Sequence, residues 1–135
     1  MKKGKNGFHE FYYDTHFKLN GDIKELPASY SIITAFATTG EEWDEDDNEK
    51  ADLRLKLHLE NAKVDKWRMT GYSPDCKHKE KSWATTLSPD EACVVGKEFL
   101  QHAIYFVDEG ILSVMLCDNG EQDTVGPMSE RIHAC

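Results

Sequence analysis

The sequence predicts an α+β domain, a two-layer sandwich in which two helices pack on one mixed or mostly antiparallel sheet of about five strands. Three observations lead to this prediction. The chain has 135 residues, which suits one domain with one core. Strand-like and helix-like segments follow one another in the order β-α-β-β-α-β-β. No run approaches the roughly 20 apolar residues that a membrane helix needs, so we expect a soluble, cytoplasmic protein that does not enter a membrane.

The first half of the predicted domain contains a strand, a helix and a strand pair. Residues 30–36, YSIITAF, form an apolar run with a β-branched centre, which predicts a buried strand. Residues 46–63 are ambiguous, because four leucines alternate with polar residues as in a half-buried strand. Strong helix formers and the lack of any β-branched residue favour a helix instead, with Ala51, Leu55 and Leu59 on one face. Residues 67–72 and 82–87 predict an antiparallel pair.

The second half contains the clearest helix signal. Ser88, Pro89 and Glu91 combine an N-cap, a proline in the first turn and a capping box, which predicts a helix over residues 88–102 packed through Val95 and Phe99. Residues 103–107 and 111–116 then predict a hairpin with Gly110 in its turn. Residues 1–29 form an N-terminal extension with room for an extra strand, residues 30–117 form the α+β domain, and residues 118–135 form a polar tail.

The charge of the chain is concentrated in one segment. The formal net charge is −9, which disfavours direct binding to nucleic acid. Seven of the 25 acidic residues lie in residues 41–49, so this segment makes the chain acidic. The segment is a solvated loop before a helix, a cation site, or a docking surface for a protein with a basic surface. The residues of the predicted acidic docking loop are Glu41, Glu42, Asp44, Glu45, Asp46 and Asp47.

Motifs for metals, cofactors and covalent chemistry fail on their spacing. Asp44, Asp46 and Asn48 have the spacing of a calcium loop, but Glu49 stands where glycine is needed and Leu55 where a glutamate is needed. We therefore predict no metal and no cofactor. The chain has no P-loop, GxGxxG or GxSxG sequence, so enzymatic activity is not predicted. Four cysteines without a secretion signal predict four reduced thiols.

Several short motifs between residues 30 and 116 resemble a known family in their order and spacing. They are Ile33-Thr34-Ala35, Asn48, Gly71, Glu80-Lys81-Ser82-Trp83 and Gln101-His102-Ala103-Ile104. The family is that of small bacterial and phage proteins known as domain of unknown function 3293 (DUF3293). The chain departs from the family pattern after Ala35, where an Asn-Pro pair is common and Phe36-Ala37-Thr38 stands here. Because the family has no assigned activity, the resemblance implies the fold and nominates positions without supplying chemistry.

These positions define the candidate binding residues, which are Thr34, Asn48, Glu80 and Gln101. We expect a non-enzymatic binding or adaptor protein that acts through the acidic loop or through a polar rim of the sheet. The alternative is a protein or enzyme that binds a small ligand or nucleotide, with Glu80 as acid or base and Gln101 and Thr34 as orienting groups. These three residues, which form the predicted polar rim, could equally form a structural hydrogen-bond network. A pocket that encloses Glu80 would favour the alternative, and a flat surface would favour the adaptor.

Overall fold

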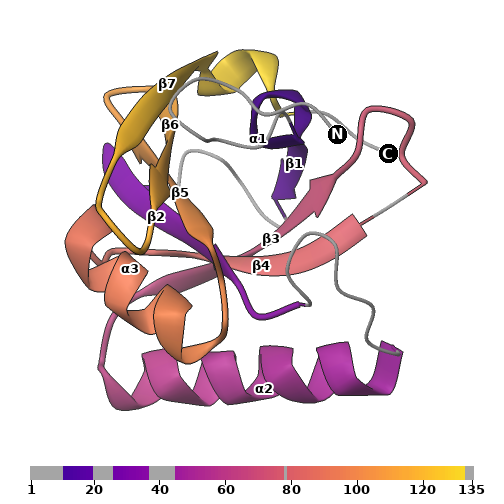
Figure 1. Cartoon of the computed structure of the whole chain (residues 1–135), viewed down its shortest axis with the longest axis vertical. Helices are drawn as coiled ribbons and strands as arrows, with labels where there is room; N and C mark the ends of the chain where they lie inside the picture. The colour runs from indigo at the N-terminus through magenta and orange to yellow at the C-terminus, as the bar shows by residue number, and fades with distance from the viewer. Residues whose placement is uncertain (1–10, 20–25, 37–44, 78, 133–135) are drawn as a thin grey trace.

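The computed structural model describes residues 11–19, 26–36, 45–77 and 79–132, and its elements form one curled sheet with two helices on one face (Figure 1). The sheet has seven strands in the order β1-β3-β4-β2-β5-β6-β7, and every neighbouring pair is antiparallel. The elements are the single turn α1 (Phe11–Asp14), β1 (His16–Leu19), β2 (Ser29–Thr34), α2 (Glu45–Asn61), β3 (Lys66–Tyr72), β4 (Lys79–Thr85), α3 (Pro89–Glu98), β5 (Ala103–Asp108), β6 (Ile111–Leu116), β7 (Gln122–Pro127) and the 3-10 turn η3 (Met128–Glu130).

The α+β fold class is therefore confirmed, with more strands than the five that were expected. The additional strands are β1, which lies in the predicted N-terminal extension, and β7, which lies in the predicted polar tail. The curl of the sheet brings the segments beside these two edge strands together. The backbone N–H of Phe17 donates to the carbonyl of Arg131 at 2.7 Å, and the hydroxyl of Tyr13 donates to the carboxylate of Asp123. The sheet consequently has the shape of a half-barrel.

Two hydrophobic cores lie on opposite faces of the sheet, because successive side chains of a strand point to opposite faces. Ile33 and Trp83 face the two helices, whereas Ile32 and Ala84 face the inside of the curled sheet. The first core includes Ala51, Leu55 and Leu59 of α2 and Ala92 and Val95 of α3. The second core includes Phe17, Met69, Val107, Leu112 and Met128. Residues from the whole length of the chain therefore share the inner core.

The ambiguous segment after residue 45 is a helix, as predicted. Its buried face contains Ala51, Leu55 and Leu59, while Leu53 and Leu57 are 53% and 50% exposed. The alternation of leucine with polar residues thus arises from two sides of a helix. The turn joining β5 to β6 also agrees with the prediction, although it has two residues, Glu109 and Gly110, with φ angles of 50° and 81°. These angles are typical of the tight hairpin turns that favour glycine.

Helix α3 begins as predicted but ends earlier. The Ser88 hydroxyl accepts from the backbone N–H of Glu91, and the Glu91 carboxylate accepts from the backbone N–H of Ser88, which completes the capping box. The helix ends at Glu98 rather than His102. The N–H groups of Leu100 and Gln101 donate to the carbonyls of Lys97 and Gly96, which is the hydrogen-bond pattern of a Schellman motif.

Leucine occupies the position of this motif where glycine is usual. Leu100 has a φ angle of 62°, in the left-handed region that non-glycine residues seldom adopt. Glycine or asparagine usually marks such a helix end, and because leucine stands here the sequence predicts a helix that continues to residue 102. The early end turns the chain at Phe99 and Leu100, directly beside the end of β2.

Candidate functional site

Two of the predicted site residues meet at the backbone of Phe36, just after β2. The Thr34 hydroxyl accepts from the N–H of Phe36 at 3.1 Å and donates to the carbonyl of Lys81 at 2.8 Å. The Gln101 side-chain amide donates to the carbonyls of Phe36 and Phe99 at 2.7 and 3.1 Å. The two side chains therefore hold the segment that leaves β2 against β4 and against the end of α3.

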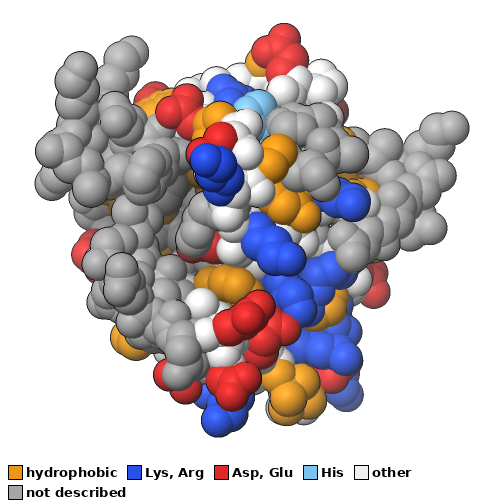
Figure 2. Space-filling view, turned by 90° about the vertical axis from the view of Figure 1, so that its right-hand side faces the viewer, with side chains coloured by type: hydrophobic (Ala, Val, Ile, Leu, Met, Phe, Trp, Pro, Cys, Tyr) orange, Lys and Arg blue, Asp and Glu red, His pale blue; other side chains and the backbone are white. Residues whose placement is uncertain are grey.

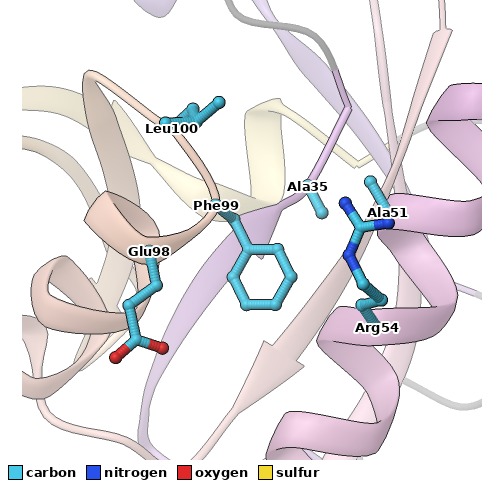
Figure 3. A pocket seen from close by; sticks show the side chains of 6 residues that line it. All are labelled: Ala35, Ala51, Arg54, Glu98, Phe99 and Leu100. Atoms are coloured by element: carbon cyan, nitrogen blue, oxygen red, sulfur yellow. The ribbon is translucent and has the colours of Figure 1, made fainter.

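A pocket of about 210 Å³ lies beside this hydrogen-bonded segment, between α2 and the end of α3. Figure 3 shows the ring of Phe99 pointing into the pocket, with Arg54 of α2 on one side and Glu98 of α3 on the other. The complete lining is Ala35, Ala51, Arg54, Glu98, Phe99 and Leu100. The pocket thus combines an aromatic ring, two small side chains and two opposite charges. These side chains come from α2, from the end of α3 and from the segment that follows β2.

Electrostatic contacts differ at the two ends of the pocket. The Glu98 carboxylate lies 3.6 Å from Nδ1 of His58, whose ring also makes an edge contact with Phe99 at a centroid distance of 6.0 Å. Arg54, in contrast, forms no ion pair or hydrogen bond with any other side chain in the part of the chain that the structure describes. Among the described residues, the guanidinium is therefore the charge at this pocket that lacks a counter-charge.

None of the four predicted binding residues lines the pocket. Glu80 is half-buried on β4 opposite Gly71, and Asn48 is half-buried in the first turn of α2. Each makes contacts within the chain. The pocket consequently does not enclose Glu80, and the role of that carboxylate as acid or base stays a prediction.

The predicted acidic docking loop lies partly outside the described residues, because Glu41, Glu42 and Asp44 belong to residues 37–44. Glu45, Asp46 and Asp47 form the first turn of α2 and are exposed. Carboxylates at this position interact favourably with the helix dipole. Figure 2 views the side where α2 begins and shows acidic and basic side chains next to one another, and Glu49 pairs with Lys81 there. Basic side chains therefore offset part of the negative charge on this face.

The cysteines differ from the prediction of four reduced thiols. Cys76 is disulfide-bonded, which the spacing of cysteines along the chain cannot reveal. Cys93 and Cys117 are free and buried. The hydrogen bond between their two thiols holds the pKa of Cys93 below its usual range and raises the pKa of Cys117, because the shared proton stays on Cys117.

The described ranges of the chain contain no group of three or more histidine, cysteine and acidic side chains that could hold a metal ion. Within the same ranges, no helix is both long and apolar enough to cross a membrane.

Sequence reasoning missed the residues that line the pocket. Arg54 lies among charged residues on a helix, where an arginine is ordinarily a solvated surface residue. Ala35 and Ala51 have small side chains that leave room in the pocket and carry no reactive group. Their importance follows only from their position beside Arg54 and Phe99, which the sequence does not show. Two signals were available, because Thr34 and Gln101 were selected as site residues and are the sequence neighbours of the lining residues Ala35 and Leu100.

Comparison with known proteins identifies one family. The family model described as "Protein of unknown function (DUF3293)" matches residues 33–104, which is more than half of the chain. The match runs from β2 to β5 and includes both helices and every residue that lines the pocket. No curated protein and no solved structure matches the chain.

Proposed function

Because the chain belongs to the DUF3293 family of proteins of unknown function, we propose a function from its own geometry, namely the binding of a small ligand between α2 and the end of α3. The observation that carries the proposal is the pocket itself, in which Arg54 faces the ring of Phe99 (Figure 3). Ligand pockets typically pair apolar walls with a few polar groups that orient the ligand. Aromatic, small apolar and charged side chains are all present in this lining.

The walls of the pocket are held in place before a ligand arrives. The segment that contains Ala35 is anchored by the hydrogen bonds of Thr34 and Gln101 to the backbone of Phe36. The Ala51 side of the pocket belongs to α2, which packs on the sheet through Leu55 and Leu59. Rigid walls favour binding, since less conformational entropy is lost when the ligand is held. Thr34 and Gln101 of the predicted polar rim thus hold one wall of the pocket without belonging to its lining.

A fragment screen by NMR tests this proposal directly. The labelled full chain is titrated with small aromatic and aliphatic fragments, and shifts of its backbone amide signals are mapped. We expect bound fragments to shift the amide signals of Ala51 and Leu100. We expect Phe99→Leu to weaken the binding of the fragments because the aromatic ring is lost. Leu57→Ala is the matched control, since it removes an exposed apolar side chain from the same helix. Fragments that bind only elsewhere, or none that bind, would contradict the proposal.

The second candidate function is the recruitment of a basic protein by the acidic segment. It is favoured by the exposure of Glu45, Asp46 and Asp47 at the start of α2. Replacing these three residues by their amides should leave the fold intact and abolish capture of a basic partner. Capture by the original protein should also weaken as salt is raised, because long-range attraction is screened. Capture that persists in the amide variant at high salt would exclude this function.

A further inference from the structure

The charges around the pocket indicate which class of ligand it accepts. Three basic side chains outside the pocket lining each have a carboxylate within 4 Å, and they are Lys66, Arg68 and Lys81, paired with Glu60, Asp52 and Glu49 respectively. Within the described residues, Arg54 has no such partner. Figure 3 shows its guanidinium beside Ala35 at one end of the pocket. A guanidinium presents five N–H donors in a planar fork, which matches the two oxygens of a carboxylate.

The opposite end of the pocket disfavours a second negative charge. The Glu98 carboxylate lies there, in the last turn of α3. The C-terminal end of a helix also carries partial negative charge from its carbonyl groups. A ligand with an acidic group at each end would therefore be repelled from Glu98 while it is attracted to Arg54. A single negative charge, placed at the Arg54 end, satisfies both conditions.

The middle of the pocket determines the size and shape of the apolar part of the ligand. The ring of Phe99 forms one wall, and the small side chains of Ala35 and Ala51 leave space opposite it. A volume of about 210 Å³ exceeds the roughly 150 Å³ of an apolar cavity that is known to hold benzene. One aromatic ring or a short branched aliphatic chain therefore fits. Such a body would contact Phe99 while its charged group reaches the guanidinium.

Building on the proposed function, we infer that the pocket takes a small organic monocarboxylate whose flat or compact apolar body packs against Phe99. Arg54 binds the carboxylate through two N–H groups, and Glu98 discriminates against dicarboxylates. The shape and charge of the pocket thus act on different parts of the ligand. Simple probes that share one ring and differ in charge should therefore bind to the pocket with different affinities.

The test uses three probes that share one ring, namely benzoate, benzamide and terephthalate. Each is titrated into the labelled full chain while the amide signals of Ala51 and Leu100 are followed. We expect benzoate to bind about tenfold more tightly than its neutral analogue benzamide, as one charge-assisted interaction would give. We expect terephthalate to bind more weakly than benzoate and to regain affinity in Glu98→Gln.

Variants of α2 separate the role of Arg54 from the effect of net charge. Arg54→Gln should remove the preference for benzoate over benzamide, and Arg54→Lys should restore only part of it because the planar fork is lost. Lys56→Gln removes the same charge from the same helix away from the pocket lining and should leave the preference unchanged. Circular dichroism and urea titration verify that each variant is folded.

The outcomes distinguish the inference from the proposed function on which it rests. Equal affinity for benzoate and benzamide, or a preference that survives Arg54→Gln, would overturn the monocarboxylate inference while binding in the pocket stands. A failure of every fragment and all three probes to shift signals at the pocket would overturn both. Terephthalate that binds as tightly as benzoate to the original protein would refute discrimination by Glu98.

Discussion

A buried ion pair joins helix α2 to the sheet, and its strength can be predicted from its geometry. The guanidinium of Arg68 donates to both carboxylate oxygens of Asp52, at 2.9 and 2.7 Å. The Asp52 side chain is 9% exposed and that of Arg68 is 23% exposed. The guanidinium carbon also lies 3.7 Å from the centroid of the Trp83 ring. The pair therefore has ideal bidentate geometry in a mostly buried site.

The coupling between the two side chains should lie between the values for exposed and for buried pairs. Exposed pairs contribute about 0.2–1 kcal/mol, whereas breaking a fully buried pair costs about 3–5 kcal/mol. Because Arg68 retains some contact with water, we expect a coupling energy of about 1.5–3 kcal/mol. The stability change of a single substitution would not equal this coupling energy, because each substitution has an additional effect. Asp52→Ala gains up to about 0.7 kcal/mol of helix propensity, and Arg68→Ala also loses the contact with Trp83.

A double-mutant cycle removes these side effects. The free energy of unfolding is measured by urea denaturation for the original protein, Asp52→Ala, Arg68→Ala and the double variant. The pair of Glu49 and Lys81 is the matched control, since its side chains are 44% and 41% exposed and it also joins α2 to the sheet, at β4 instead of β3. Its coupling should be about 0.2–1 kcal/mol and should shrink with salt. A coupling for Asp52 and Arg68 that is no larger, or equally sensitive to salt, would refute the reasoning.

Three further predictions concern stability and thiol reactivity. Leu100→Gly should raise the free energy of unfolding by about 0.5–1 kcal/mol in urea titrations, because glycine adopts the left-handed conformation without steric cost, and a loss of stability would contradict this. Burial raises the pKa of Tyr30 to about 12, so its contribution to stability is present below pH 10 and is lost as the pH rises from about 10 to about 12. Tyr30→Phe should make the measured decline in stability shallower over that range, and an unchanged slope would count against it. Cys93 and Cys117 are 7% and 6% exposed and should react with a thiol reagent only as fast as the protein opens, so immediate labelling of the folded protein would show that they are accessible.

Local signals in the sequence were sufficient for most of the fold. The capping box at Ser88, the glycine turn before β6 and the β-branched run of β2 each depend on residues within a few positions of one another. Helix α2 was also predictable, because residue type outweighed a misleading alternation of leucines. Strand β7 was missed because QDTVGP contains few strand formers, and pairing with β6 supplies what its own residues lack.

The candidate site depended much more on tertiary structure. Thr34 and Gln101 could be selected as polar residues at the ends of elements, but their shared partner, the backbone of Phe36, appears only when β2 and the end of α3 lie side by side. The left-handed Leu100 ends α3 where no local signal predicts an end.

The sequence by itself determined the class of fold, the acidic character and the two helices, because local propensity and periodicity act between neighbours in the chain. Tertiary structure alone decided that Arg54 of α2 faces Phe99 across a pocket that Ala35 and Ala51 also line. It likewise decided that Asp52 is buried against Arg68. These contacts join residues that are 16 or more positions apart in the sequence. Their formation follows from how the helices pack on the curled sheet, which no pattern within a single segment specifies.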